Sequence, residues 1–480
     1  MNLLKKCKLY RSFGKLSAIC MLLIAVMLLG GCQTQLLDPK QNAPLAPASA
    51  RINVAANGNI RSESIGRVAG NAGDTPDALL HHHLRAMAKK ERTAVIDHNE
   101  ARLLIDGPQS YKAMFDAMEK AQDHINLEVY IFEDDEIGHR LQQTLLRKQR
   151  QGVQVNLIYD SLGSLTTPKS IFDELREAGA RVYEFNPVNP AKGKILDINN
   201  RDHRKILVVD GKVGFTGGIN ISSVYSQGSG VKAVTGSSKK KRKANEAGWR
   251  DTQIEVHGPA VAEMQRIFFS TWDQQKPEVR QPQPGLEPEY FPLIPVAGDK
   301  VLRVIASSTN DKENLIYTDM LAAITHAKRS VHLTMAYFSP DSNTIEALQN
   351  AAMRGVDVVL VLPGFSDVRL VLDAGRSHYT ALLKAGVKIY ERHDALLHAK
   401  TAVIDGVWST VGSTNMDMRS FLHNNEVNIV VLGIGFGAEM EEMFNQDVAQ
   451  ARQITEKEWK ERGVSMRMRQ WFSRVWSFWL

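Results

Sequence analysis

The feature that most constrains the fold of this 480-residue chain is a set of residues that occurs twice with the same spacing. In each copy a His is followed by a Lys two positions later, an Asp five positions after the Lys, a Gly seven positions after the Asp and an Asn three positions after the Gly. The first copy consists of His203, Lys205, Asp210, Gly217 and Asn220. The second copy consists of His398, Lys400, Asp405, Gly412 and Asn415. The fold must therefore present two equivalent motifs.

The segments around the two motifs repeat as well. Apolar strand patterns at residues 125–132 and 331–338 each follow a helical pattern, at 111–121 and 316–327. Further strand patterns follow Gly152 and Gly355, and similar segments then occur at 177–183 and 384–390. Strands that alternate with helices indicate α/β layers in each half. The length also suggests two domains with tails rather than one core.

Composition sets the boundaries between these parts. Five prolines between residues 277 and 292 mark a linker between the halves, and a stretch rich in Asn, Ala, Pro and Gly precedes the first half. We therefore predict a signal peptide (1–31), a flexible tether (32–95), a first domain (96–276), a Pro-rich linker (277–300), a second domain (301–450) and an amphipathic tail (451–480). Within the tether, the run from His81 to His83 is interpreted as a polar segment rather than a metal site.

The first 31 residues have the pattern of an export signal. They contain five basic residues and no acidic one, and their apolar run from 16 to 29 is shorter than the roughly 20 residues that cross a bilayer. The end, Leu29-Gly30-Gly31-Cys32, resembles the lipobox of bacterial lipoproteins, in which the Cys is acylated; a plain anchor helix is the alternative. We expect an exported lipoprotein held through Cys32 that faces the periplasm or the cell exterior. Gln33 is compatible with the outer membrane.

Removal of the signal peptide would change the net charge and the cysteine content of the mature protein. It leaves 54 basic against 53 acidic residues, which gives little support to a nucleic-acid footprint. Of Cys7, Cys20 and Cys32, only the last would remain, carrying lipid. The mature protein would then have neither a disulfide nor a cysteine metal site.

The repeated residues suit chemistry at a phosphodiester. Apolar β-formers lie between Lys and Asp in each motif, and positions two apart on a strand share a face, so His and Lys should point into a common cleft. Two lysines and two small-residue turns with Asn side chains can hold phosphate oxygens. A neutral imidazole is a suitable nucleophile, and a second, protonated imidazole can donate to the leaving alkoxide. The lysines supply the positive charge, so we expect neither a metal nor a cofactor.

On these residues the chain resembles the phospholipase D superfamily, whose HKD motif has this spacing, from about residue 96 to 450. The resemblance implies an α/β fold of two phospholipase D-type αβ sandwich domains, related by an internal repeat, with the active site at their interface. It implies that His203 is the nucleophile and His398 the general acid. The motif aspartates, Asp210 and Asp405, are grouped with the catalytic residues, or else order the strand ends. The residues expected to bind phosphate are Lys205, Lys400, Asn220, Asn415 and Ser413.

Two further regions resemble the cardiolipin synthase branch of that family: residues 249–251, and residues 417–420 with 424–428. They contain Asp251 and Glu426, which follow Asn220 and Asn415 by 31 and 11 positions. In the family such carboxylates pair with the active histidines, orienting the ring and fixing its tautomer. A buried salt bridge is the alternative for both.

The resemblance implies a phosphatidyltransferase that forms cardiolipin from two phosphatidylglycerol molecules through a phosphohistidine. Phospholipase D hydrolysis is an alternative, because transfer and hydrolysis differ only in whether water is kept out. A nuclease of the same fold is a weaker alternative that rests on one basic segment. The expected partner is a phospholipid membrane with phosphatidylglycerol, and no specific nucleic acid is expected. The acceptor alcohol and the oligomeric state are left open.

Two segments are candidates for membrane contact. An insert at 227–247 carries five consecutive cations at 239–243, which either attract anionic lipid at about 1 kcal/mol each or form a solvated loop. The C-terminal 22 residues hold four of the seven tryptophans. This pattern suits a helix lying in the membrane plane; a helix docked on the second domain with its aromatics in the core is the alternative. The apolar stripe of that helix would comprise Met468, Trp471, Phe472, Val475, Trp476 and Trp479.

Overall fold

The computed structural model of the protein describes residues 75, 78–80, 82–83, 94–187, 199–229, 248–273, 288–309, 311 and 313–476. The predicted signal peptide, the lipobox with Cys32, most of the tether and the cations at 239–243 lie outside the described residues. In the C-terminal helix, side chains are described up to Ser473.

The first half alternates strands and helices as the sequence predicts. Its elements are β1 (Ile96–Ile105), α4 (Asp106–Lys120), β2 (His124–Val129), α5 (Glu136–Arg150), β3 (Gln154–Asp160), α6 (Lys169–Glu177), β4 (Arg181–Phe185), β5 (Arg201–Asp202), β6 (Ile206–Val209), β7 (Val213–Gly217), the 3-10 helix η3 (Ser223–Tyr225), β8 (Trp249–Arg250), β9 (Thr252–His257) and α7 (Ala260–Asp273).

The second half repeats this order and then continues. Its elements are β10 (Lys300–Ser307), α8 (Leu315–His326), β11 (Ser330–Met335), β12 (Phe338–Ser339), α9 (Ser342–Met353), β13 (Asp357–Pro363), α10 (Arg369–Arg376), α11 (Tyr379–Lys384), β14 (Lys388–Arg392), β15 (Leu396–Leu397), β16 (Lys400–Ile404), β17 (Trp408–Gly412), β18 (Met416–Asp417), α12 (Met418–Leu422), β19 (Asn424–Leu432) and α13 (Ile434–Ala449). The described part of the chain ends with β20 (Ala451–Ile454), α14 (Glu456–Lys460) and α15 (Val464–Trp476).

Local sequence explains where equivalent elements begin. Asp135 precedes α5, and its carboxylate accepts hydrogen bonds from the N–H groups of Ile137 and Gly138 at 3.0 Å. Asp341 caps α9 at the equivalent place in the second half. Such N-caps satisfy free amide groups of the first turn. The motif strands β6 and β16 consist of buried residues, as expected for strands inside a sheet.

The strand order is the same in both halves. The first-half sheet runs β1-β9-β7-β6-β2-β3-β4, and the second-half sheet runs β10-β19-β17-β16-β11-β13-β14, to which β20 adds at the far edge. In each, three parallel strands (β2-β3-β4 and β11-β13-β14) follow an antiparallel part. Antiparallel pairing of β1 with β10 joins the two sheets edge to edge, with Ile96 opposite Leu302. The predicted α/β fold with an internal repeat is confirmed.

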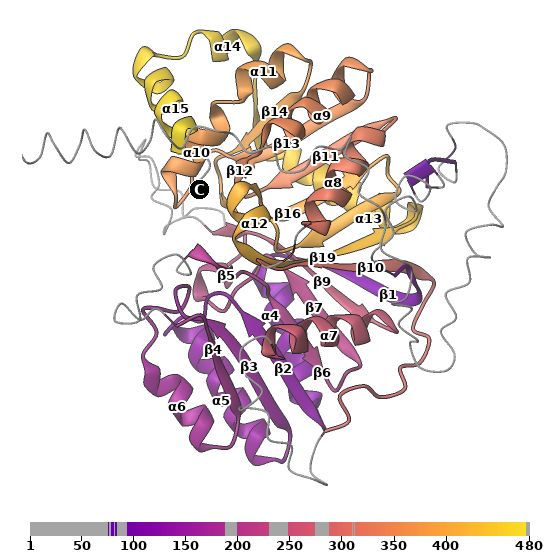
Figure 1. Cartoon of the computed structure of the whole chain (residues 1–480), viewed down its shortest axis with the longest axis vertical. Helices are drawn as coiled ribbons and strands as arrows, with labels where there is room; N and C mark the ends of the chain where they lie inside the picture. Colours follow the sequence, from indigo (N-terminus) through magenta and orange to yellow (C-terminus); the bar gives the residue numbers. More distant parts are fainter. Residues whose placement is uncertain are drawn as a thin grey trace, which may run out of the picture. The chain divides into compact units, whose positions relative to one another are not determined.

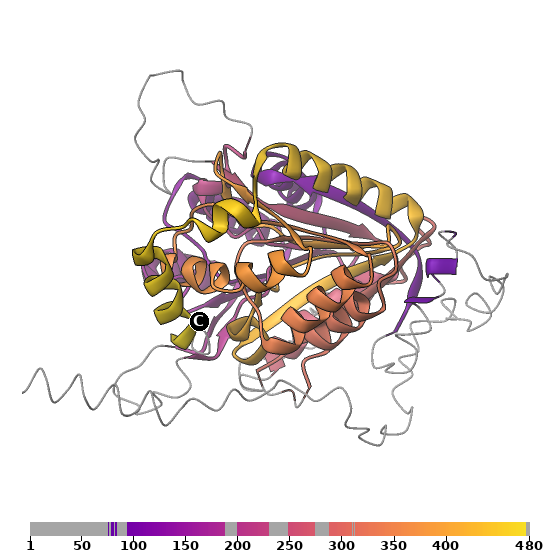
Figure 2. The same ribbon diagram turned by 90° about the horizontal axis from the view of Figure 1, so that it is seen from above.

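Helices cover both faces of each sheet (Figures 1 and 2). In the first half α4, α5 and α6 pack on one face and α7 on the other. Between the halves lies a shared apolar core, to which both α7 and α13 contribute, so each half completes the core of the other. Its fully buried members include Val208, Ile254, Met264, Val411, Val427 and Ile429. Burial of this kind stabilises the contact by about 25 cal/mol per Å² of apolar area.

Two predictions about the ends of the chain need correction. Nε2 of His83 lies 2.8 Å from Oδ2 of Asp405, and both side chains are buried, so the end of the tether packs on the second half rather than being only a polar segment. The tail predicted from residue 451 begins with β20, which pairs with β14 in the sheet. Among the described helices, none has the length and apolar character needed to cross a bilayer.

Candidate active site

The two motif histidines are brought together by short strands that cross between the halves. Strand β5 pairs in parallel with the start of β19, and the N–H of His203 donates to the carbonyl of Asn425 at 3.0 Å. Strand β15 pairs in the same way with β8, and the N–H of His398 donates to the carbonyl of Arg250 at 2.7 Å. The site therefore exists only where the halves meet.

Each histidine ring contacts a carboxylate of the other half. Nδ1 of His203 lies 2.9 and 3.0 Å from the two oxygens of Glu426, and Nδ1 of His398 lies 2.7 Å from Oδ2 of Asp251. Both carboxylates are fully buried. Since a carboxylate accepts hydrogen bonds, we assign the proton to Nδ1, which leaves the Nε2 lone pair for chemistry.

The two rings lie in unequal electrostatic environments. Burial, helped by Lys205 and Lys400, lowers the pKa of His203 well below its ordinary value. Burial and Lys400 also lower the pKa of His398, but the charge and hydrogen bond of Asp251 oppose that effect. Burial raises the pKa of Glu426 to about 7. His203 is thus the ring more strongly held neutral, and His398 the ring that more readily keeps a second proton.

Both motif lysines are buried against their own histidine. Nζ of Lys205 donates to the carbonyl oxygen of His203 at 2.6 Å, and Nζ of Lys400 lies 3.0 Å from each ring nitrogen of His398. Burial lowers the pKa of Lys205 to about 7 and that of Lys400 to about 8. An anionic ligand would favour their charged forms, so the pair is suited to a phosphate group.

The other predicted phosphate-binding residues, Asn220, Asn415 and Ser413, differ from one another in their hydrogen-bond partners. Oδ1 of Asn220 accepts from the N–H of Ile131 at 3.2 Å, so this amide is already partly engaged. Oδ1 of Asn415 is buried without a hydrogen-bond partner. The hydroxyl of Ser413 donates to Glu426, so Ser413 supports the carboxylate that orients His203, and its contact with phosphate stays a prediction.

The motif aspartates also need correction, because the structure places them in turns rather than beside the histidines. The carboxylate of Asp210 accepts from the N–H groups of residues 122, 123 and 124 at 2.8–3.2 Å. The carboxylate of Asp405 accepts from residues 328, 329 and 330 at 2.7–3.1 Å. Both residues have positive φ, 51° and 55°, at the turn after the motif strand. They order the strand ends, the second of the two roles that the sequence left open.

Aromatic side chains around the histidines were not predicted. The ring of Tyr130 lies 5.0 Å from that of His203, and the ring of Trp249 lies 5.2 Å from that of His398. The hydroxyl of Tyr225 is 3.4 Å from Nδ1 of His398. These rings lower the local dielectric and limit water around the site. These aromatic residues occupy non-equivalent positions in the two halves, so a comparison of the two repeats could not identify them.

Two buried arginines adjacent to site residues hold the halves together. Arg204, between His203 and Lys205, donates to the carbonyl of Ser307 at 2.8 Å. Arg250 forms a two-point ion pair with Asp447 of α13, both bonds being 2.8 Å. Both arginines lie within motifs that the sequence analysis identified. Their contacts could not be predicted, because the partners belong to the opposite half.

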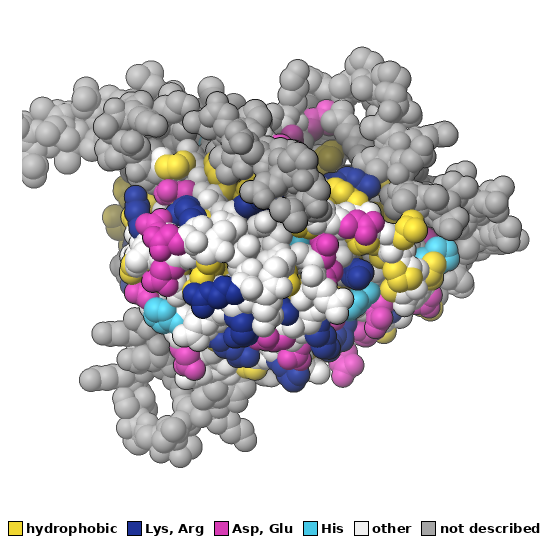
Figure 3. All heavy atoms as spheres, turned by 90° about the horizontal axis from the view of Figure 1, so that it is seen from below, with side chains coloured by type: hydrophobic (Ala, Val, Ile, Leu, Met, Phe, Trp, Pro, Cys, Tyr) yellow, Lys and Arg dark blue, Asp and Glu magenta, His cyan; other side chains and the backbone are white. Residues whose placement is uncertain are grey.

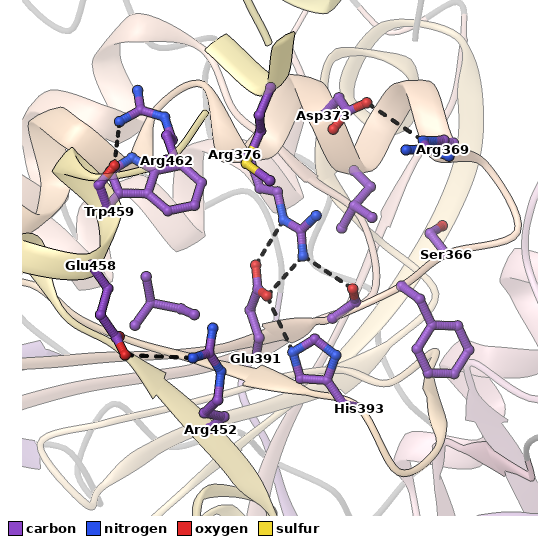
Figure 4. Close-up of a pocket in the computed structure, with 15 residues that line it drawn as sticks. Ser366, Arg369, Asp373, Arg376, Glu391, His393, Arg452, Glu458, Trp459 and Arg462 are labelled. Atoms are coloured by element: carbon purple, nitrogen blue, oxygen red, sulfur yellow. Dashed lines mark hydrogen bonds and ion pairs between the residues drawn. The ribbon is translucent and has the colours of Figure 1, made fainter. Parts of the chain in front are cut away.

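A cavity of about 660 Å³ lies elsewhere in the second half (Figure 4). Its walls come from residues 364–366, α10, α14 and the strands β14 and β20, and neither motif histidine lines it. Within the described residues, no group of three or more His, Cys, Asp or Glu side chains is arranged to hold a metal ion.

Comparisons with known proteins agree with this geometry. A family model described as cardiolipin synthase, phospholipase D-like domain, matches residues 114–253 and 320–448. A cardiolipin synthase from Geobacillus thermodenitrificans is 38% identical over 380 residues, which cover 78% of this chain and 72% of the relative. One from Listeria monocytogenes is 34% identical over 403 residues, which cover 83% and 80%. The crystal structure of a phosphatidylserine synthase from Haemophilus influenzae shares the fold, with a TM-score of 0.61 at 12% identity over 83% of this chain and all of that one.

The turn role of the motif aspartates predicts a loss of stability rather than of chemistry. Asp210→Ala leaves backbone N–H groups at the start of β2 without acceptors, which should lower the free energy of unfolding by about 2–4 kcal/mol. Asp405→Ala should cost at least as much, because it also removes the partner of His83. Urea denaturation measures both, with the exposed Asp116→Ala as the control. Wild-type stability combined with lost turnover would instead assign the aspartates to catalysis.

A substitution at Gly218 tests whether Asp251 is needed to support His398. An added Cβ at this position would lie 2.1 Å from Oδ1 of Asp251. Gly218→Ala should therefore displace Asp251 and reduce kcat by about 100-fold, as expected for a misplaced catalytic group. Gly435→Ala is the matched control, since a Cβ there meets nothing within 4 Å. Unchanged kcat in a folded Gly218→Ala protein would contradict the role of Asp251.

Proposed function

Because this chain belongs to the cardiolipin synthase family of phospholipase D-like proteins, we propose that it joins two phosphatidylglycerol molecules into cardiolipin and releases glycerol. The observation that carries the proposal is the pair of buried histidines, each held by a carboxylate of the opposite half and each beside a buried lysine. This arrangement supplies a nucleophile, a proton donor and two cations to one phosphodiester.

In the first step, Nε2 of His203 attacks the phosphorus of a phosphatidylglycerol. The bond from phosphorus to the glycerol oxygen breaks, and a protonated His398 gives its proton to that oxygen. Hydrogen bonding of Nδ1 to Glu426 stabilises the positive charge that forms on the His203 ring. The low pKa of His203 supports its role as nucleophile, since the ring is neutral before attack.

In the second step, the headgroup hydroxyl of another phosphatidylglycerol attacks the phosphohistidine. His398 takes the hydroxyl proton, the new oxygen–phosphorus bond forms, and the phosphorus–nitrogen bond breaks. Lys205 and Lys400 bind the equatorial phosphate oxygens throughout. Water in place of the lipid hydroxyl would give phosphatidic acid, so the aromatic side chains around the histidines favour transfer by limiting water.

Trapping experiments test the assignment of the histidines. His398→Asn removes the group that activates the acceptor, so a phosphatidyl group should accumulate on His203 when the labelled phosphatidyl donor has a leaving group that needs no proton, such as p-nitrophenol. The bond should be acid-labile, as phosphohistidine is, and absent from His203→Asn. Label retained in His203→Asn would show that another residue is the nucleophile.

The pH dependence of kcat/KM should be bell-shaped. Loss of the proton on His398, which the first step requires, should reduce activity as pH rises, and loss of the Lys205 and Lys400 charges should reduce it further through about 7–8. Protonation of Glu426 should reduce activity as pH falls below about 7. The low pKa of His203 means that its own protonation does not set the acid limb. A flat profile between pH 6 and pH 9 would contradict this assignment of the limbs.

The charge pattern of one face bears on the nuclease alternative. On the face drawn in Figure 3, at the first-half end of the molecule, dark-blue Lys and Arg side chains are interspersed with magenta Asp and Glu among the described residues. A nucleic-acid footprint requires a continuous basic surface. This face therefore does not favour a nuclease.

Helix α15 supports contact with a membrane surface. It lies against α10, and its Gln470 and Ser473 are buried, whereas the side chains of Met468, Trp471 and Phe472 are 67%, 70% and 52% exposed. The helix is thus docked through polar residues and turns its apolar side outward, unlike a helix whose aromatics fill a core. Exposed Trp and Phe side chains next to Arg suit the interface of an anionic bilayer. Export, acylation of Cys32 and lipid contact by the 239–243 cations stay predictions.

Vesicle binding tests this surface. The double substitution of Trp471 and Phe472 by Ser should weaken binding to phosphatidylglycerol vesicles about tenfold or more, because two exposed aromatic side chains no longer enter the interface. The melting temperature should barely change, since both side chains are exposed. Substitution of the buried Ser473 by Asn is the control for packing. A large loss of stability with unchanged vesicle binding would show that the aromatics belong to the protein core.

A further inference from the structure

A carboxylate that the chemistry described so far does not need contacts Tyr337, an aromatic neighbour of His398. Asp367 lies in the loop between β13 and α10, and its side chain is exposed. The hydroxyl of Tyr337 donates to its oxygens at 2.8 and 3.0 Å, and the hydroxyl of Ser366 donates at 3.0 Å. The ring of Tyr337 in turn lies 6.3 Å from that of His398, nearly perpendicular to it.

This negative charge opposes the main task of the site. The substrate is an anionic diester, and two buried lysines are present to attract it, so a nearby carboxylate weakens the attraction. A carboxylate is, however, a strong acceptor for alcohol hydroxyls. Its position is therefore explained if the group that it meets is a neutral polyol rather than the phosphate.

The feature occurs only on the His398 side of the repeat. The pairing of Phe132 with Ile221 and of Phe338 with Met416 aligns the halves, and places Ile131 where the second half has Tyr337. The register of β2 with β3 and of β11 with β13 aligns Gln154 with Asp357, which places Ser164 where the second half has Asp367; the hydroxyl of Ser164 accepts from the N–H of Phe132 at 3.0 Å. The first half thus offers an apolar side chain and a neutral hydroxyl, with no carboxylate, at the equivalent places.

The loop that carries Asp367 is held in place by Arg376, which is itself paired with Glu391 (Figure 4). Arg376 donates to the carbonyl of Gly364 at 3.0 Å and forms a two-point ion pair with Glu391 at 2.8 and 2.7 Å. Burial, together with the charge of Asp367, keeps the pKa of Tyr337 above its ordinary value, so its phenol remains a donor. The carboxylate is therefore presented in a fixed orientation.

We propose that Asp367, with Tyr337 and Ser366, forms the subsite that binds the glycerol headgroup of the acceptor lipid. The inference rests on the proposed function, in which both the leaving and the attacking alcohol must lie next to His398. Asp367 accepts a hydrogen bond from the headgroup hydroxyl that does not react, which directs the primary hydroxyl to the phosphohistidine. That hydroxyl gives its proton to His398, its oxygen binds phosphorus, and the bond to His203 breaks. Asp367 is thus a specificity residue that favours a polyol over water.

The ratio of cardiolipin to phosphatidic acid tests this subsite, because both products arise from the same intermediate. With phosphatidylglycerol vesicles, Asp367→Asn should lower the ratio about tenfold, the size expected for weakening one hydrogen bond to a charged group. Tyr337→Phe should lower it less. Damage confined to packing would reduce both products equally and leave the ratio unchanged.

A competition between soluble alcohols makes the test sharper. Glycerol and 1-propanol are offered at equal concentrations to the wild type, to Asp367→Asn and to Asp357→Asn, a control whose exposed carboxylate pairs with Lys388 at 2.8 Å. Only Asp367→Asn should lose the preference for glycerol. An unchanged preference and product ratio in Asp367→Asn would overturn the subsite. If the wild type instead forms neither cardiolipin nor phosphatidic acid, the proposed function itself fails.

Discussion

The structure depends on the exchange of carboxylates between its halves. His203 is held by Glu426 and His398 by Asp251, so each motif contains only part of what its histidine needs. Buried carboxylates are costly unless each is hydrogen-bonded, and here the histidine that each carboxylate meets lies across the interface. The crossing strands β5 and β15, the bridging side chain of Arg204 and the shared apolar core all serve to keep these pairs in register.

Small differences between the copies turn a symmetric scaffold into an asymmetric site. Ser413 donates to Glu426, whereas the equivalent Gly218 leaves room for the shorter-reaching Asp251. Burial and both lysines lower the pKa of His203, whereas Asp251 opposes the lowering at His398, and this inequality is what a nucleophile and a proton donor require. The acceptor subsite proposed around Asp367 extends the same asymmetry to the alcohol. A duplicated chain can thus assign two roles to two copies of one residue.

The sequence allowed the fold class, the family and the residues that meet at the interface to be predicted, because identical spacing is visible without coordinates. It did not resolve residues whose role depends on a distant neighbour. Asp210 shares the motif with His203, yet its carboxylate binds the start of β2. Ser413 sits in a small-residue turn like a phosphate ligand, yet it binds Glu426. Tyr337 and Asp367 are 30 positions apart and have no counterpart in the first half, so the repeat could not identify them.

The pairing of β1 with β10 determines how a lipid can reach the histidines. It makes one continuous sheet from two, and it covers an edge of each half that would otherwise be free to pair with other chains. Parting the halves would break this ladder, expose the shared core and separate each histidine from its carboxylate. Hinge opening of the kind used by two-domain enzymes would therefore be costly, which favours entry of the lipid headgroup into a site that the two halves keep assembled.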